Sequence, residues 1–226
     1  MSLQMTDVSV RLPDASARAR AAAAGRKPMA EVSCTVEGGR VREVVVPVRA
    51  ARALEAEGLG LPREEQEAFD ALHALEGRVC FTMLTEMLSR RDHAAQEVRT
   101  KLASYGFRPQ EIDAAIERAQ DMRFLNDARF ASYFIEERKR RGWGRRKIEL
   151  ELRRRGVDVG ELAGYPEAFF DEDDDLQRAL QLLERKSVPA ARAQDKFIRH
   201  LMAKGFPYAV AARAARMRLE GEQDRA

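Results

Sequence analysis

The sequence is poor in the residues that build metal, redox and disulfide sites. Its 226 residues include two cysteines, three histidines and one tryptophan. Cys34 and Cys80 lie far apart without the short spacing of a zinc or redox motif, so both are expected to be reduced and packed as small hydrophobes. His73, His93 and His200 stand in separate segments without metal-ligand spacing. We therefore expect no metal and no cofactor.

Long apolar runs are also absent. No stretch is long and apolar enough to cross a bilayer, and the first 28 residues lack the apolar segment of a secretory signal. A cytoplasmic protein without membrane contact is expected. The sequence also has no nucleophile elbow, no paired cysteine and histidine, and no carboxylate pair suited to acid–base catalysis, so we expect no enzymatic activity.

Charged residues and helix formers are abundant instead. Charged residues make up 34% of the chain and aromatic residues 7%, which is typical of a mainly helical protein. The net charge of +3 hides local contrast. Between Glu137 and Arg155 ten basic residues face three acidic ones, a net charge of +7, whereas Asp171–Asp175 is five acids in a row. Such patches indicate more about partners than the overall charge does.

The first 76 residues predict a tail followed by a small cap. Residues 1–28 contain several helix and strand breakers and no sustained apolar period, which predicts a flexible tail. Residues 29–76 predict an α+β cap, because Glu31–Val48 alternates apolar and polar residues around a Gly-Gly turn, as a β-hairpin does. Pro47 marks the end of the second strand. Two helical segments follow the hairpin, at residues 50–57 and 63–75.

From residue 77 onward the chain repeats itself. Glycines at 106, 156 and 205 stand 50 and then 49 residues apart. Apolar residues recur four, eight and twenty-two positions before each glycine: Leu102, Leu152 and Leu201; Val98, Ile148 and Phe197; Leu84, Phe134 and Leu183. This register predicts three tandem three-helix repeats, at 77–124, 125–170 and 171–220, which stack into an elongated, curved array to bury their apolar faces.

In the middle repeat, Gly164 and Pro166 interrupt the third helix, which is expected to be short or broken.

The middle repeat carries the candidate functional residues. Its first two helices are joined by a glycine-rich corner and hold these candidates for partner or nucleic-acid binding: Arg138, Lys139, Arg140, Arg141, Trp143, Arg145, Arg146, Lys147, Leu150, Arg153 and Arg154. On a helical wheel Arg146, Lys147, Arg153 and Arg154 surround Leu150, opposite the buried face. Basic residues around an outward leucine favour a surface that contacts phosphates or an acidic protein. The alternative is that cations in the last helical turn only offset the helix dipole.

Two further features have competing interpretations. Trp143 lies between two glycines and is either an exposed anchor that stacks on bases or a plug for the angle between the helices. The acidic run Asp171–Asp175 either mimics nucleic acid or caps the helix that follows it, and capping is favoured.

Four stretches carry a family pattern: EVRTKLASYGFRPQEIDAAI from Glu97, FLNDARFAS from Phe124, GWGRRKIELELRRRGVD from Gly142 and DKFIRHLMAKGFPY from Asp195. In this order and spacing they resemble the RecX family of bacterial RecA regulators. Asn126 stands where the family usually has aspartate. The resemblance implies a non-enzymatic modulator in DNA repair, recombination and the SOS response. Its implied partner is the RecA filament, protein plus single-stranded DNA, whose strand exchange, ATP hydrolysis and stimulated repressor cleavage it restrains, with weak direct nucleic-acid binding. A monomer is expected, although the sequence does not determine the oligomeric state.

Two other functions fit the same pattern. Three-helix units with a basic second helix also resemble helix-turn-helix modules, which predicts a DNA-binding protein that acts alone. A helical-repeat scaffold for another protein is the third possibility.

Overall fold

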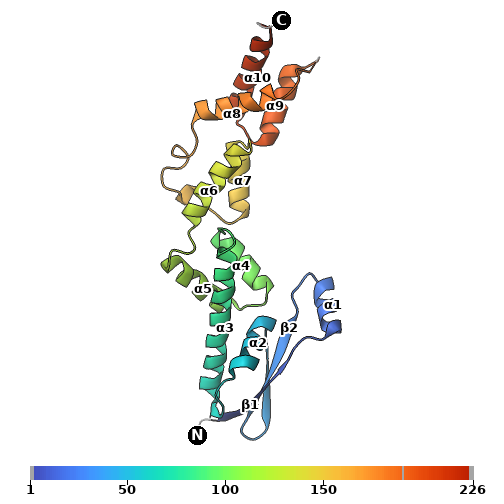
Figure 1. Cartoon of the computed structure of the whole chain (residues 1–226), viewed down its shortest axis with the longest axis vertical. Coiled ribbons are helices and arrows are strands. Elements are labelled where there is room, and N and C mark those ends of the chain that lie inside the picture. The colour runs from blue at the N-terminus through green and yellow to red at the C-terminus, as the bar shows by residue number, and fades with distance from the viewer. Residues whose placement is uncertain (1–2, 190, 224–226) are drawn as a thin grey trace. The chain divides into compact units, whose positions relative to one another are not determined.

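The computed structural model describes residues 3–189 and 191–223 and is mainly helical, as the composition predicts (Figure 1). The chain divides into two compact units, Met1–Asn126 and Asp127–Ala226. The first unit contains β1 (Gln4–Arg11), α1 (Ala15–Ala23), β2 (Met29–Val36), β3 (Arg40–Pro47), α2 (Val48–Glu57), β4 (Arg63–Glu64), α3 (Glu65–Leu88), α4 (Ala95–Ser104) and α5 (Pro109–Asp121). The second contains α6 (Asp127–Arg140), α7 (Arg145–Arg154), a 3-10 turn (Val159–Glu161), α8 (Glu172–Glu184), α9 (Ala193–Lys204) and α10 (Tyr208–Gln223). Among the described residues, no helix has the length and apolar content needed to cross a bilayer.

The predicted hairpin is β2 and β3. The two strands pair antiparallel from Met29 opposite Pro47 to Val36 opposite Arg40. Gly38 and Gly39 form the turn with φ of 83° and 76°, a conformation that residues with a Cβ rarely adopt. The strand β3 ends at Pro47, as predicted.

The prediction of a flexible tail over residues 1–28 is wrong for most of that segment. The sheet has the order β3-β2-β1-β4, so β1 is an inner strand, antiparallel to both neighbours. Met5 is fully buried, and the Asp14 side chain caps α1 by accepting a hydrogen bond from the Ala17 amide at 2.6 Å. The strand β1 was not predicted from the sequence because its stability comes from pairing with β2, a partner distant in the chain, and only one of its faces is apolar.

The predicted boundary between the cap and the first repeat, at residues 76 and 77, lies inside α3. The first half of this helix gives Leu72 and Leu75 to the core beneath the sheet, and the second half gives Leu84 to the core shared with α4 and α5. The cap and first repeat are therefore joined by one continuous helix. The cysteines are free and buried, as expected, Cys34 in the first of these cores and Cys80 in the second.

The same helix-ending turn occurs at the glycine of each of the three repeats. Each repeat glycine has a positive φ, and the next residue donates its amide to the carbonyl of the leucine four positions before the glycine: Phe107 to Leu102 at 3.4 Å, Val157 to Leu152 at 3.0 Å and Phe206 to Leu201 at 3.1 Å. This is the Schellman arrangement, which requires a left-handed residue at the glycine position. The apolar positions that defined the repeat are all buried.

The third helix of the middle repeat is reduced to the 3-10 turn Val159–Glu161, as Gly164 and Pro166 predicted. The segment after it carries Tyr165, Phe169 and Phe170, whose rings pack on one another with centroids 5.8 and 6.0 Å apart. An aromatic loop thus replaces a helix next to the basic residues.

Candidate functional site

The corner between α6 and α7 is held against the end of α9. The helix α6 ends with the same turn as the repeat glycines, since Trp143 donates its amide to the carbonyl of Arg138 at 3.0 Å and Gly142 has a φ of 74°. Two amides at the start of α7 then bond to α9, from Gly144 to the Lys204 carbonyl at 2.9 Å and from Arg146 to the Gly205 carbonyl at 3.0 Å. These bonds satisfy two of the amides that a helix start leaves without intrahelical partners.

The outward face of α7 is exposed, as the helical wheel predicted. Leu150 is 45% exposed, and Arg146, Arg153 and Arg154 around it are exposed as well. Arg154 forms an ion pair with Glu151 at 2.9 Å. Within the described residues, the side chains of Arg146 and Arg153 form no hydrogen bond or ion pair. We call these four residues, Arg146, Leu150, Arg153 and Arg154, the α7 face.

The helical-wheel prediction is wrong for Lys147. We expected it beside Leu150, but its side chain is half-buried and its ammonium lies 4.1 Å from the centre of the Trp143 ring. The Cβ of Lys147 lies against Gly205, so closely that a Cβ on that glycine would overlap it. The packing of α7 on α9 therefore draws Lys147 away from the α7 face.

The contacts of Trp143 favour the interpretation that it fills the angle between α6 and α7 over the one that it stacks on bases. Its ring is half-buried, and two cations of the same chain contact it. One is the ammonium of Lys147, and the other is the guanidinium of Arg138, which lies 5.0 Å from the ring centre. The same guanidinium lies 4.6 Å from the centre of the Phe134 ring. Cation–π contacts of this kind stabilise the corner and occupy ring surface that a base would need. Arg138 and Trp143 thus serve to pack the corner.

Arg145 is also held within the unit. It pairs with Glu149 at 2.7 Å, and the Tyr165 hydroxyl donates to the same carboxylate at 2.6 Å. Burial raises the pKa of Glu149, but the hydrogen bonds from Tyr165 and Arg145 outweigh it and lower this pKa overall. Burial and the bond to Glu149 raise the pKa of Tyr165. The aromatic loop and α7 are therefore joined by a charged hydrogen-bond network at neutral pH.

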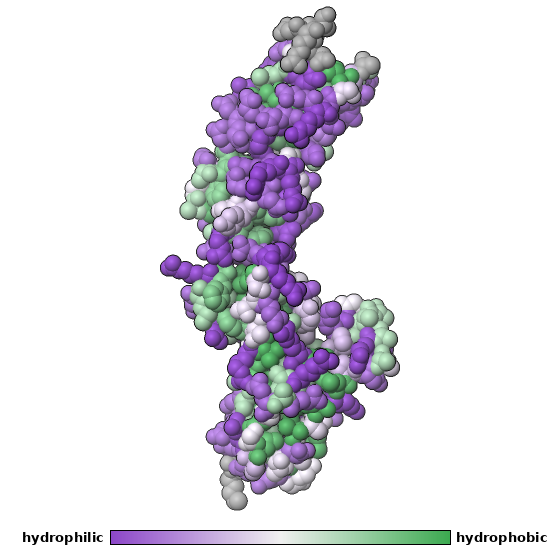
Figure 2. All heavy atoms as spheres, viewed as in Figure 1, coloured by the Kyte–Doolittle hydropathy of each residue, from purple (hydrophilic) through white to green (hydrophobic). Residues whose placement is uncertain are grey.

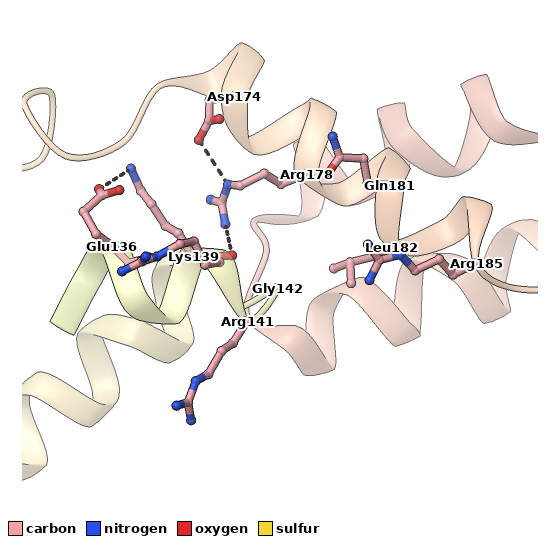
Figure 3. Close-up of a pocket in the computed structure, with 10 residues that line it drawn as sticks. Glu136, Lys139, Arg141, Gly142, Asp174, Arg178, Gln181, Leu182 and Arg185 are labelled. Carbon is pink, nitrogen blue, oxygen red and sulfur yellow. Dashed lines mark hydrogen bonds and ion pairs between the residues drawn. The ribbon is translucent and has the colours of Figure 1, made fainter. Parts of the chain in front are cut away.

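The remaining candidates line a pocket between the end of α6 and α8, with a volume of about 700 Å³. Its basic residues are Lys139, Arg140, Arg141, Arg178 and Arg185. Figure 3 shows Arg178 reaching from α8 toward the end of α6. Gln181 and Leu182 lie further along the same helix, and Arg185 follows directly after its end. Lys139 pairs with Glu136 at 3.2 Å, and Asp174 is the second acid in the pocket. Five basic residues against two acidic ones make the pocket suited to an anion.

Arg178 and Arg185 were missed by the sequence analysis. Arg178 donates from Nη1 to the carbonyl of Trp143 at 2.9 Å and from Nε to Asp174 at 3.1 Å, and it also pairs with Asp175. Its contact with the corner could not be predicted from the sequence, because Trp143 lies 35 positions earlier in the chain.

The acidic run Asp171–Asp175 at the start of α8 has a structural role, as favoured from the sequence. Asp171 caps the helix by accepting a hydrogen bond from the Asp174 amide at 2.9 Å. Asp175 is only 4% exposed. Burial raises the pKa of Asp175, and the neighbouring Arg178 opposes that rise. The run therefore caps α8 and positions Arg178 through Asp174 and Asp175.

We expect the substitution Arg178→Ala to destabilise the second unit by about 3 kcal/mol, because it leaves Asp175 buried without its partner. Arg185→Ala, on the exposed side of the same pocket, should change stability by less than about 0.5 kcal/mol. The measurement is urea unfolding followed by the fluorescence of Trp143, the one tryptophan of the chain, which reports on this unit. Equal midpoints for the two variants would contradict the role given to Arg178.

These features define a class of protein. It has tandem helical repeats, each with a second helix that ends in the same glycine turn, and the middle repeat presents an exposed basic helix face. On the face seen in Figure 2, the surface over α8 and α9 is mostly hydrophilic.

Comparison with known proteins identifies the family. Residues 81–118 match the family model described as the first three-helix domain of RecX, and residues 126–159 match the second. The regulatory protein RecX of Actinobacillus pleuropneumoniae (serotype 5b, strain L20) is 33% identical over 125 residues, which cover 54% of this chain and 82% of that protein. The chain therefore belongs to the RecX family of regulatory proteins, and the resemblance seen in the sequence is confirmed.

Two crystal structures share the fold. RecX from Lactobacillus salivarius is 21% identical, with a TM-score of 0.56 over 63% of this chain and 96% of that one. A second structure of a regulatory protein RecX is 15% identical, with a TM-score of 0.59 over 80% of this chain and 92% of that one. At these identities the likeness concerns the fold alone.

Proposed function

We propose that this protein binds the RecA filament formed on single-stranded DNA through its α7 face, and thereby restrains ATP hydrolysis, strand exchange and stimulated repressor cleavage. The observation that supports the proposal is the α7 face itself: an exposed leucine among arginines, two of which have no ion-pair partner within the described residues, in a chain of the RecX family. Charges left without partners on a packed helix are available to another molecule.

The chemistry of the α7 face suits the proposed partner. Arg146, Arg153 and Arg154 lie three or four residues from Leu150, so that all four side chains share one side of α7. Guanidinium groups bind phosphates and carboxylates through paired hydrogen bonds. A central apolar side chain ringed by arginines is also an arrangement common at protein interfaces. Such a face can contact the phosphates of the filament's DNA, an acidic surface of its protein, or both.

The pocket between α6 and α8 offers a second point of contact in the same unit. Arg140 and Arg141 are exposed at its rim. We propose that they add electrostatic attraction, which accelerates the encounter with a polyanionic filament. Regulation in this scheme requires binding alone and no chemical step.

The experiment that tests the proposal is a titration of this protein against RecA on single-stranded DNA with ATP. We expect ATP hydrolysis to fall at substoichiometric to equimolar ratios, and the protein to sediment with the filament. Unchanged hydrolysis together with no co-sedimentation would overturn the proposal. Tight, sequence-selective binding to naked duplex would point instead to a DNA-binding protein that acts alone.

A further inference from the structure

A second group of ionisable side chains lies in the first unit, between α3 and α5. His73 and Glu76 are three residues apart on α3 and therefore share one side of that helix. Glu111 lies in the first turn of α5, and Arg108 precedes that helix. Glu76 is 2% exposed, and the side chain of Glu111 is 10% exposed. Two buried carboxylates in one place need a compensating cation.

The three donor groups converge on one point. One donor atom each from His73, Glu76 and Glu111 lies within 4.8 Å of the other two. A single nitrogen, Nη2 of Arg108, contacts all three residues: Oε2 of Glu76 at 3.3 Å, and Oε1 of Glu111 and Nδ1 of His73. The guanidinium nitrogen therefore stands where a cation shared by these three ligands would stand.

Arg108 satisfies the hydrogen-bonding groups and charges of these three residues only in part. Its Nη1 lies 3.2 Å from Nε2 of His73 while its Nη2 contacts Nδ1. A neutral imidazole has only one acceptor nitrogen, so one of these contacts sets an N–H group against another. Within the described residues, Oε2 of Glu111 is buried and has no hydrogen-bond partner. One guanidinium also leaves a negative charge of the two carboxylates uncompensated.

The charges and donor atoms of the cluster favour a divalent metal ion over the guanidinium. A neutral imidazole offers a lone pair to a metal. A divalent ion would match both carboxylates in charge and accept the lone pair of the imidazole.

We propose that His73, Glu76 and Glu111 form a Zn²⁺ site in which the ion displaces the guanidinium of Arg108. One imidazole nitrogen and two carboxylate oxygens are donors that zinc accepts, with the fourth position left to water. A histidine and a glutamate three residues apart on one helix ligate metals in helical bundles too. The imidazole favours zinc over Mg²⁺, which prefers oxygen ligands. The ion would link α3 to α5, and the site is independent of the proposed function.

The test is calorimetric titration of metal-free, full-length protein with Zn²⁺ at neutral pH. We expect one ion per chain, and tighter binding by the Arg108→Ala variant, on the order of tenfold or more, since the competing guanidinium is gone. His73→Ala and Glu111→Gln should each weaken binding by on the order of tenfold or more. His93→Ala serves as the control, because His93 forms another histidine–carboxylate pair, with Glu97 at 3.5 Å; it should bind like the unmodified chain.

Zinc binding that survives His73→Ala, or no binding by a folded Arg108→Ala variant, would overturn the proposal. If Arg108→Ala does not fold, thermal unfolding of the other variants decides. Zn²⁺ should then raise the unfolding midpoint of the unmodified chain and of His93→Ala, since a ligand that binds only the folded state stabilises it. An equal rise for His73→Ala would exclude this site.

Discussion

Replacing Gly144 with alanine is expected to destabilise the second unit by about 3 kcal/mol. A Cβ at this position would overlap the backbone of Gly205 and Phe206, and backbone atoms cannot move aside as a flexible side chain can. The separation would also lengthen two hydrogen bonds, from Gly144 to Lys204 and from Arg146 to Gly205, each worth about 1 kcal/mol.

The position isolates packing from backbone strain. Gly144 has φ of −86° and ψ of 163°, which alanine adopts freely, so backbone strain does not contribute to the loss. Gly221→Ala is the matched control in the same unit, because a Cβ there would meet no described atom within 4 Å. It should stabilise α10 by about 0.5–1 kcal/mol, through helix propensity. Urea unfolding followed by Trp143 fluorescence compares the two. A loss below about 1 kcal/mol at Gly144 would mean that α7 and α9 separate easily.

Removing the charge of the α7 face is expected to abolish most of the proposed effect on RecA. In the variant Arg146→Ala, Arg153→Ala, Arg154→Ala, we expect the concentration that halves RecA ATP hydrolysis to rise by on the order of a hundredfold, because each lost charge-assisted contact costs about 1–2 kcal/mol. The fold should survive, since all three side chains are exposed and Ile148 and Leu152 keep the buried side of α7.

The control removes equal charge elsewhere in the same unit. Lys196, Arg199 and Arg216 are exposed on α9 and α10, and their triple alanine variant should keep its effect within about threefold, the loss expected from weaker long-range attraction alone. Equal loss in both variants would show that only net charge matters. The salt dependence distinguishes DNA phosphates from an acidic protein surface as the group that the α7 face contacts. In a plot of log binding constant against log salt concentration, each phosphate contact on a single strand contributes a slope of about −0.7. A slope unchanged by the α7-face substitutions would indicate contact with protein alone.

The helical repeats could be predicted because their signals are local. Each repeat glycine and the leucine whose carbonyl closes its turn are four residues apart, and the apolar spacing follows the helical period. The same reasoning predicted that Ile148 and Leu152 face inward and Leu150 outward, and the structure confirms it. The strand β1 could not be predicted in this way, because its partner in the ladder begins some twenty residues later.

By itself, then, the sequence determined the glycine turns that end the second helix of each repeat and the side of α7 that faces the core, since these depend on backbone conformation over a few residues. Only the tertiary structure decided which of the basic residues are available to a partner. Lys147 is turned aside by α9, Arg145 is held by the aromatic loop, and the corner is bound by Arg178 from α8. These contacts join residues that lie tens of positions apart in the chain, so no local pattern encodes them.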